Sequence, residues 1–177
     1  MQDAPFLSGS NPYETRVVRS IAFVDLSGFT RFTDAEGDSA AVVVLTQFRT
    51  ALREVCARHG VRIAKWLGDG AMLVGVQAEE IAEALVDIED LFDKLQSPLP
   101  LRAGVASGPV ILFEGDDYIG RSVNLAARLC DRATDGQVLS PREFVSSLMV
   151  NTRATKVGTY EITGIAEPVD VVELSSR

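Results

Sequence analysis

Two aspartates occupy positions where a carboxylate could hold a metal ion. Asp25 lies near the end of the apolar segment 19–26, where a carboxylate is costly unless it is paired or binds a metal. Asp69 lies in the turn Gly68-Asp69-Gly70 between two apolar segments. Each also has a simpler interpretation, because an aspartate at a strand end can cap its own turn and Asp-Gly is a favoured hairpin dipeptide. If the hairpin packs beside the first strand, the two carboxylates meet at one end of the sheet. Such hard oxygen ligands favour Mg²⁺ or Mn²⁺.

The turn after Asp25 has the composition of a phosphate-binding loop. It reads Ser27-Gly28-Phe29-Thr30, and its glycine leaves backbone N–H groups free to approach a phosphate. We therefore predict Phe29 and Thr30 as substrate-binding residues. A metal site beside such a turn favours a nucleoside triphosphate as the substrate.

Lys65 lies in the apolar segment RIAKWLGDG, just before the Asp69 turn. In a strand its side chain shares a face with Leu67, while Trp66 points to the other face. One interpretation is an ordinary lysine on an exposed face. The other is a hydrogen-bond donor at the edge of a bound base or phosphate.

A later segment, 121–132, has the pattern of a helix that could bind a phosphoryl group. Asn124 and Arg128 are four residues apart and so lie on one helical face. The guanidinium of Arg128 is suited to phosphoryl oxygens. Arg121 and Arg132 on the same helix also allow a solvated basic face. Asp117, just before this helix, is a plausible loop acid.

The overall charge and the histidine content narrow the chemistry. The chain has 177 residues, the size of one domain, and a formal net charge of −8. An acidic chain argues against nucleic acid as a partner but does not exclude a small phosphate ligand. The single histidine, His59, lies at a predicted helix end, where an imidazole is often a solvated capping group. Histidine-rich zinc sites and Ser-His-Asp hydrolysis are therefore disfavoured, and catalysis must rely on carboxylates, Lys, Arg or bound metal.

The remaining composition predicts a cytoplasmic domain. Cys56 and Cys130 form no CxxC pair and no disulfide framework, which indicates a reducing compartment. No apolar run approaches the ~20 residues of a membrane span, so we expect no direct membrane contact. Residues 1–18 are mostly polar and have no signal-peptide core, and we interpret them as a leader or linker.

The pattern of elements predicts a ferredoxin-like α+β fold. Its β-α-β-β-α-β order implies an antiparallel sheet with helices packed on one face, plus C-terminal additions. The predicted strands are 19–26, 61–67, 71–76, 101–106, 110–114, 137–139 and further strands within 156–174, and the predicted helices are 39–59, 79–95, 121–132 and 141–148.

Three separated segments resemble the signature blocks of class III nucleotidyl cyclases, in the family's order. They are FVDLSGFT, KWLGDG and DYIGRSVNLAAR, and the tail GIAEPVDVVEL resembles the closing strand of bacterial, mycobacterial-like members. The resemblance makes residues 19–177 a cyclase catalytic domain. It implies an adenylyl cyclase that converts ATP to 3′,5′-cyclic AMP and pyrophosphate with two divalent metal ions, Mg²⁺ or Mn²⁺.

The resemblance also assigns a role to each candidate residue. Asp25 and Asp69 match the metal-binding aspartates, with the Leu26 carbonyl as a further ligand. Lys65 and Asp117 match the pair that recognises adenine. In the second group, Asn124 matches the residue that orients the ribose, and Arg128 matches the transition-state arginine. The family's sites form between two catalytic domains, so a homodimer with shared active sites is implied.

One position departs from the family pattern. Many members carry a basic residue just before the glycine of the closing motif, where this chain has Thr163. Lys156 is a candidate substitute for anchoring the triphosphate. Three alternatives are a guanylyl cyclase, which typically has an acidic residue at the Lys65 position, a nucleotide-binding dimerisation module without turnover, and a diguanylate cyclase. The last is disfavoured because no GGDEF-like hairpin is present.

Overall fold

The structure, a computed structural model, describes residues 15–115 and 117–177. Its strands are β1 (Arg16–Leu26), β2 (Arg62–Leu67), β3 (Gly70–Gly75), β4 (Leu101–Phe113), β5 (Asp117–Ile119), β6 (Val138–Pro141), β7 (Thr152–Tyr160) and β8 (Val169–Ser176). Its helices are α1 (Phe29–Glu36), α2 (Asp38–His59), α3 (Ala78–Lys94), α4 (Arg121–Arg132) and the short 3₁₀ helix η1 (Arg142–Phe144). The predicted leader, residues 1–18, lies largely outside the described residues, and β1 begins three residues before the predicted strand.

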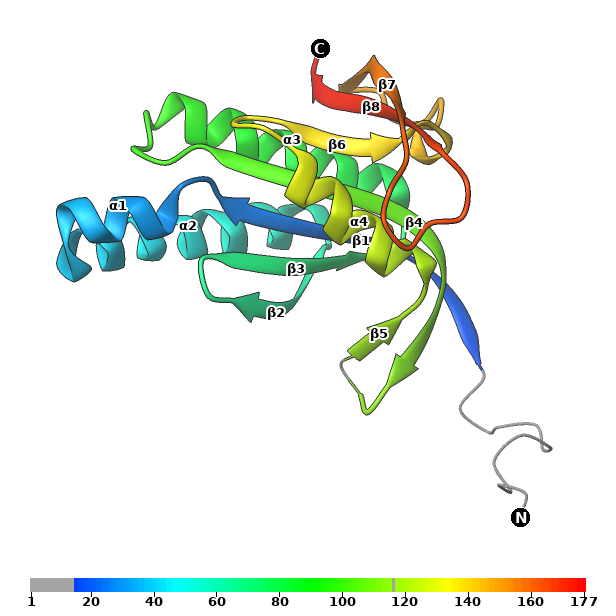
Figure 1. The fold of residues 1–177 in the computed structure, drawn as a ribbon, viewed down its shortest axis with the longest axis horizontal. Helices are drawn as coiled ribbons and strands as arrows, with labels where there is room; N and C mark the ends of the chain where they lie inside the picture. The colour runs from blue at the N-terminus through cyan, green and yellow to red at the C-terminus, as the bar shows by residue number, and fades with distance from the viewer. Residues whose placement is uncertain (1–14, 116) are drawn as a thin grey trace.

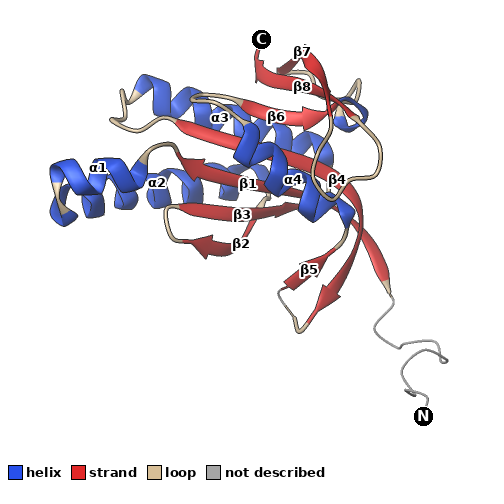
Figure 2. Ribbon diagram, in the orientation of Figure 1, coloured by secondary structure: helices blue, strands red, loops and turns tan. Residues whose placement is uncertain are grey.

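One sheet organises the molecule, in the order β2-β3-β1-β4-β6-β8-β7, with β5 paired to β4 (Figures 1 and 2). The central strand β1 is antiparallel to both β3 and β4. The unit β1-α2-β2-β3-α3-β4 therefore places its strands in the order β2-β3-β1-β4. This arrangement confirms the predicted ferredoxin-like α+β fold.

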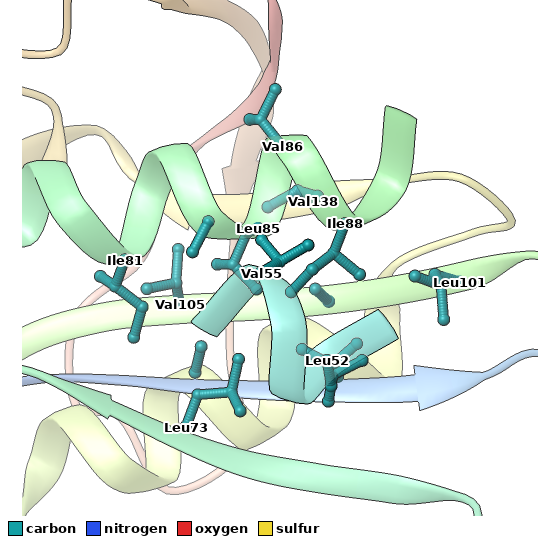
Figure 3. Packing of buried hydrophobic residues seen from close by; sticks show 14 of the residues in the cluster. Leu52, Val55, Leu73, Ile81, Leu85, Val86, Ile88, Leu101, Val105 and Val138 are labelled. Atoms are coloured by element: carbon teal, nitrogen blue, oxygen red, sulfur yellow. The ribbon is translucent and has the colours of Figure 1, made fainter. Parts of the chain in front are cut away.

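The main core lies between the sheet and helices α2 and α3. Side chains alternate along β1, so that Ala22, Val24 and Leu26 face these helices. Figure 3 shows aliphatic side chains of α2 and α3 packed against β3, β4 and β6, among them Leu52, Val55, Leu73, Ile81, Leu85, Val105 and Val138. Each such buried side chain contributes about 1.5–3 kcal/mol.

Helix α4 covers the opposite face, so the prediction of helices on one face only was wrong. Leu125 and Leu129 of α4 pack on Ile21 of β1 and on neighbouring side chains of β3 and β4, and Figure 1 shows α4 in front of the sheet with α2 and α3 behind it. The helix can approach closely because β4 has a glycine beneath it. A Cβ on Gly104 would lie 2.2 Å from the backbone nitrogen of Cys130.

The sheet differs from the prediction in two further ways. It is mixed, because β6 runs parallel to β4. The predicted strands 101–106 and 110–114 are one continuous strand, β4, in which Gly108 and Pro109 pair with Arg19 and Val18 of β1. The proline is tolerated because β6 pairs only with Ala103 and Gly104 and β5 only with residues 111–113, which leaves that edge of β4 unpaired at Pro109.

Smaller differences concern the helices. Helix α1 was not predicted, and only a turn was assigned where it begins. It leaves a weak sequence pattern because its eight residues carry few apolar side chains and none is fully buried. The predicted helix 141–148 is reduced to η1. His59 does end α2, but its ring is hydrogen-bonded to Asp87 of α3 at 2.8 Å instead of being solvated. Within the described residues, no helix has the length and apolar character needed to cross a bilayer.

Candidate functional site

Asp25 and Asp69 meet at one end of the sheet. Asp25 pairs with Gly70 across β1 and β3, and the backbone N–H of Leu26 donates to the carbonyl of Asp69 at 3.2 Å. A Cβ on Gly70 would lie 2.8 Å from the carbonyl oxygen of Val24, so glycine lets the turn reach this close to β1. The expected packing of the hairpin beside the first strand is therefore confirmed.

The negative charges of the two carboxylates repel one another. Partial burial raises the pKa of Asp69, and the negative charge of Asp25 raises it further. Asp25 is itself bound by Arg102 of β4, whose Nε and Nη2 donate to one carboxylate oxygen at 3.0 and 2.6 Å. These hydrogen bonds raise the pKa of Arg102.

A divalent cation suits this arrangement. Mg²⁺ and Mn²⁺ are bound by oxygens, and Mg²⁺ is often held by one or two carboxylates together with substrate phosphates and water. Asp25 and Asp69 supply the two carboxylates, and a cation between them would relieve the repulsion that raises the pKa of Asp69. Within residues 15–115 and 117–177, no cluster of three or more His, Cys, Asp or Glu side chains forms a complete metal cage. The remaining ligands would therefore come from a carbonyl, water or the substrate.

The predicted phosphate-binding turn lies beside this pair. An open pocket of about 520 Å³ is lined by Asp25, Leu26, Gly28, Phe29, Thr30, Arg31, Asp34, Asp69 and Arg102. Gly28 precedes α1 with φ 78°, a left-handed conformation that favours glycine. The first N–H groups of a helix have no intrahelical acceptor, and Gly28 offers no capping side chain. Phe29 and Thr30 therefore present backbone donors where an anion could bind.

Lys65 and Asp117 form a second group. The ammonium of Lys65 in β2 is hydrogen-bonded and ion-paired to the carboxylate of Asp117 in β5, and both side chains are partly exposed. Asp117 begins a strand and is not the loop acid that the sequence suggested. Trp66 points to the other face, as predicted, and packs edge-on against Phe48 of α2.

Asn124 and Arg128 share the solvent-facing side of α4. Both are exposed, because the helix packs on the sheet through Leu125 and Leu129. In the described part of the chain, Arg128 forms one ion pair, with the nearby carboxylate of Asp131 at 3.6 Å. A loose surface ion pair of this kind contributes about 0–1 kcal/mol, so the guanidinium can readily change partner.

Arg102 is the site residue that the sequence analysis missed. Its signal was a charged residue inside an otherwise apolar strand, LRAGVA. Among the residues lining the Asp25 pocket, Arg31 and Arg102 are the cationic ones.

Thr163 lies exposed in the loop between β7 and β8, and Lys156 lies exposed on β7. Neither is among the residues that line the pocket.

Comparison with known sequences identifies a protein family and several relatives. The family model described as the adenylate and guanylate cyclase catalytic domain matches residues 13–173. An uncharacterized protein of Mycobacterium tuberculosis is 35% identical over 158 residues, 89% of this chain and 41% of the relative. An adenylate cyclase of Streptomyces coelicolor is 34% identical over 131 residues, 73% of this chain and 34% of the relative. The chain thus spans well under half the length of these relatives.

Solved structures share the fold. The adenylyl cyclase CyaB from Pseudomonas aeruginosa superposes with a TM-score of 0.79 at 24% identity, covering 92% of this chain and 96% of that one. The guanylate cyclase domain of RhGC from Catenaria anguillulae, in complex with GTP, gives 0.79 at 17% identity, covering 90% and 97%. At these identities the likeness establishes the fold. Together with the family model, which matches most of the sequence, it shows that the chain belongs to the adenylate and guanylate cyclase catalytic domain family.

Proposed function

We propose that this chain is an adenylyl cyclase that converts ATP to 3′,5′-cyclic AMP and pyrophosphate. The observation that carries the choice of ATP is the contact between Lys65 and Asp117. Adenine presents an amino group where guanine presents a carbonyl. A carboxylate accepts from that amino group, while the ammonium donates to a ring nitrogen. The 34% identity to an adenylate cyclase of Streptomyces coelicolor supports the same choice.

The reaction is an intramolecular phosphoryl transfer. The 3′-hydroxyl oxygen of ATP forms a bond to the α-phosphorus, the bond to the β-phosphate oxygen breaks, and pyrophosphate leaves while the hydroxyl proton passes to solvent. Two bound divalent ions would lower the pKa of the hydroxyl and neutralise the triphosphate. Asp25, Asp69 and the Leu26 carbonyl would hold them.

The protein's own side chains would orient the substrate and meet the developing charge. The backbone at Phe29 and Thr30 would bind phosphate oxygens. Asn124 would orient the ribose, and Arg128 would stabilise the charge that builds on the α-phosphoryl group. We expect Arg128→Ala to lower kcat by about 10²-fold or more, the usual effect of removing such a group.

We further propose a homodimer with shared sites, in which one protomer supplies the metal ligands and its partner supplies Lys65, Asp117, Asn124 and Arg128. Two observations support it. Asn124 and Arg128 lie on the exposed side of α4, where a nucleotide held by a second copy could reach them. Large apolar side chains are exposed on the arm formed by the outer end of β4 and β5, including Phe113 and Ile119, which are 42% and 53% exposed. The two free, buried cysteines fit a cytoplasmic location.

The test is the product formed from each nucleotide. With Mn²⁺ present, ATP should give cyclic AMP far faster than GTP gives cyclic GMP, and Asp25→Ala should abolish both. A preference for GTP would make the protein a guanylyl cyclase. No product from either nucleotide, with a dimer present in solution, would leave a nucleotide-binding module without turnover.

A further inference from the structure

The arm that carries Asp117 is held to β2 by side chains and not by the sheet. β5 pairs with β4 only, at Ile111, Leu112 and Phe113. β2 lies on the far side of β3 and β1 in the strand order. Figure 1 shows β4 bending so that β5 comes below the sheet, near the start of β2. The spacing between Lys65 and Asp117 therefore depends on side-chain contacts between β2 and β5.

A β-bulge in β2 presents two basic side chains to the arm. Residues three apart in a regular strand lie on opposite faces. Here the register shifts between Ile63 and Lys65, so that Arg62 pairs with Val74 and Lys65 pairs with Met72. Val74 and Met72 both belong to the apolar cluster between α4 and the sheet that includes Ile21, Leu125 and Leu129, which we call the cluster under α4. The extra residue thus places Arg62 and Lys65 on the same face, the face over which β5 lies.

Arg62 makes its own contact with β5. Its Nη2 donates to the hydroxyl of Tyr118 at 2.7 Å, and its guanidinium lies 5.7 Å from the centre of the Tyr118 ring. Tyr118 is partly buried and packs against the cluster under α4, and this packing holds its ring in place. Arg62 is exposed, so its contact with Tyr118 contributes only a modest energy. The contact nevertheless joins the edge strand β2 to an aromatic ring that is held by the core.

We infer that Arg62 and Tyr118 form a latch that positions Asp117 against Lys65 and so sets the nucleobase specificity of the proposed cyclase. A base that hydrogen-bonds to Lys65 and Asp117 competes with the bond between these two side chains. While that bond is exchanged, the Arg62–Tyr118 contact keeps β5 over β2. Arg62 and Tyr118 are positioning residues, because they act through Lys65 and Asp117. The inference rests on the proposed function, and it refines which residues determine the choice of base.

The test compares Arg62→Gln, Arg62→Lys and Tyr118→Phe with Arg153→Gln, a matched exposed arginine on the other edge strand, β7. Arg62→Gln should raise KM for ATP about three- to tenfold while kcat changes less than about twofold, as expected for loss of one hydrogen bond and one exposed cation–π contact. The ratio of kcat/KM for ATP to that for GTP should fall by a similar factor. Tyr118→Phe keeps the ring and should show a smaller change, Arg62→Lys should recover part of the loss, and Arg153→Gln should behave as wild type.

A second readout does not depend on turnover. In nucleotide-free protein, the backbone amide of Ile119 should exchange with deuterium faster in Arg62→Gln than in wild type or Arg153→Gln. Unchanged exchange together with an unchanged ratio of ATP to GTP use would overturn the latch. If the wild-type protein preferred GTP, the proposed function would fail, but faster exchange at Ile119 and a raised KM for GTP would still support the latch.

Discussion

Replacing Asp69 by asparagine tests the electrostatics of the proposed metal site in a way that separates stability from catalysis. The pKa of Asp69 is raised by burial and by Asp25, so its ionised carboxylate opposes folding in the metal-free protein. Asparagine removes the charge and keeps the hairpin, because Asn-Gly suits such a turn as well as Asp-Gly does. The hydrogen bond from Leu26 to the backbone carbonyl of residue 69 is unaffected.

The expected magnitude follows from the neighbouring charges. As a general scale, two like unit charges about 4 Å apart repel by about 4 kcal/mol at an effective dielectric constant of about 20. Arg102 offsets much of this repulsion, since it donates two hydrogen bonds to Asp25, and solvent screens the partly exposed pair further. We therefore expect Asp69→Asn to raise the free energy of unfolding of the metal-free protein by about 1 kcal/mol. In a domain of this size, that gain corresponds to a Tm about 2–4 °C higher.

The assay is thermal unfolding with EDTA and with Mn²⁺, using Glu167→Gln as a control that neutralises an exposed loop carboxylate. In wild type, Mn²⁺ should raise the Tm, because a ligand that binds only the folded state stabilises it. In Asp69→Asn the EDTA value should rise, the Mn²⁺ shift should largely disappear, and cyclase activity should be lost. A lower Tm in EDTA, with the control unchanged, would refute the idea that the two carboxylates repel one another.

Three other measurements test the same geometry. In EDTA, one component of the wild-type free energy of unfolding should fall as pH rises from 3.8, the ordinary pKa of Asp69, through its raised value in the folded protein. The folded state holds this proton more tightly than the unfolded chain does, so losing the proton lowers stability. Urea titrations should find this component missing in Asp69→Asn. Gly104→Ala should destabilise by about 3 kcal/mol or more, since its methyl group would lie 2.2 Å from the backbone nitrogen of Cys130; a urea midpoint near wild type would contradict the close packing of α4. Asp25→Ala and Arg128→Ala should each lose nearly all activity when alone, yet their mixture should recover about a quarter of wild-type activity, because half of randomly assorted dimers are mixed and each mixed dimer has one intact site. No recovery in proven heterodimers would argue against shared sites.

Whether an element could be predicted depends on how local its signal in the sequence is. The strands and long helices could be predicted because their apolar periodicity is set within a few residues, as in α2 and α3. Helix α1 was missed because its eight residues bury no side chain fully, so it leaves little apolar pattern. The continuity of β4 was missed because Ser107-Gly108-Pro109 has the composition of a turn, and only pairing with β1 keeps it extended.

The residue types available for chemistry could be read from the sequence alone: an aspartate near a strand end, an aspartate in a hairpin turn, a glycine turn, a lysine, and an asparagine and an arginine one helical turn apart. Which of these residues meet depends on the folded arrangement of the strands. Register between β1 and β3 brings Asp25 to the Asp69 turn, and the curl of β4 brings Asp117 to Lys65. The structure also revealed Arg102 on Asp25 and Arg62 on Tyr118. Such contacts join residues more than forty positions apart, and strand pairing and side-chain packing create them only once the chain has folded.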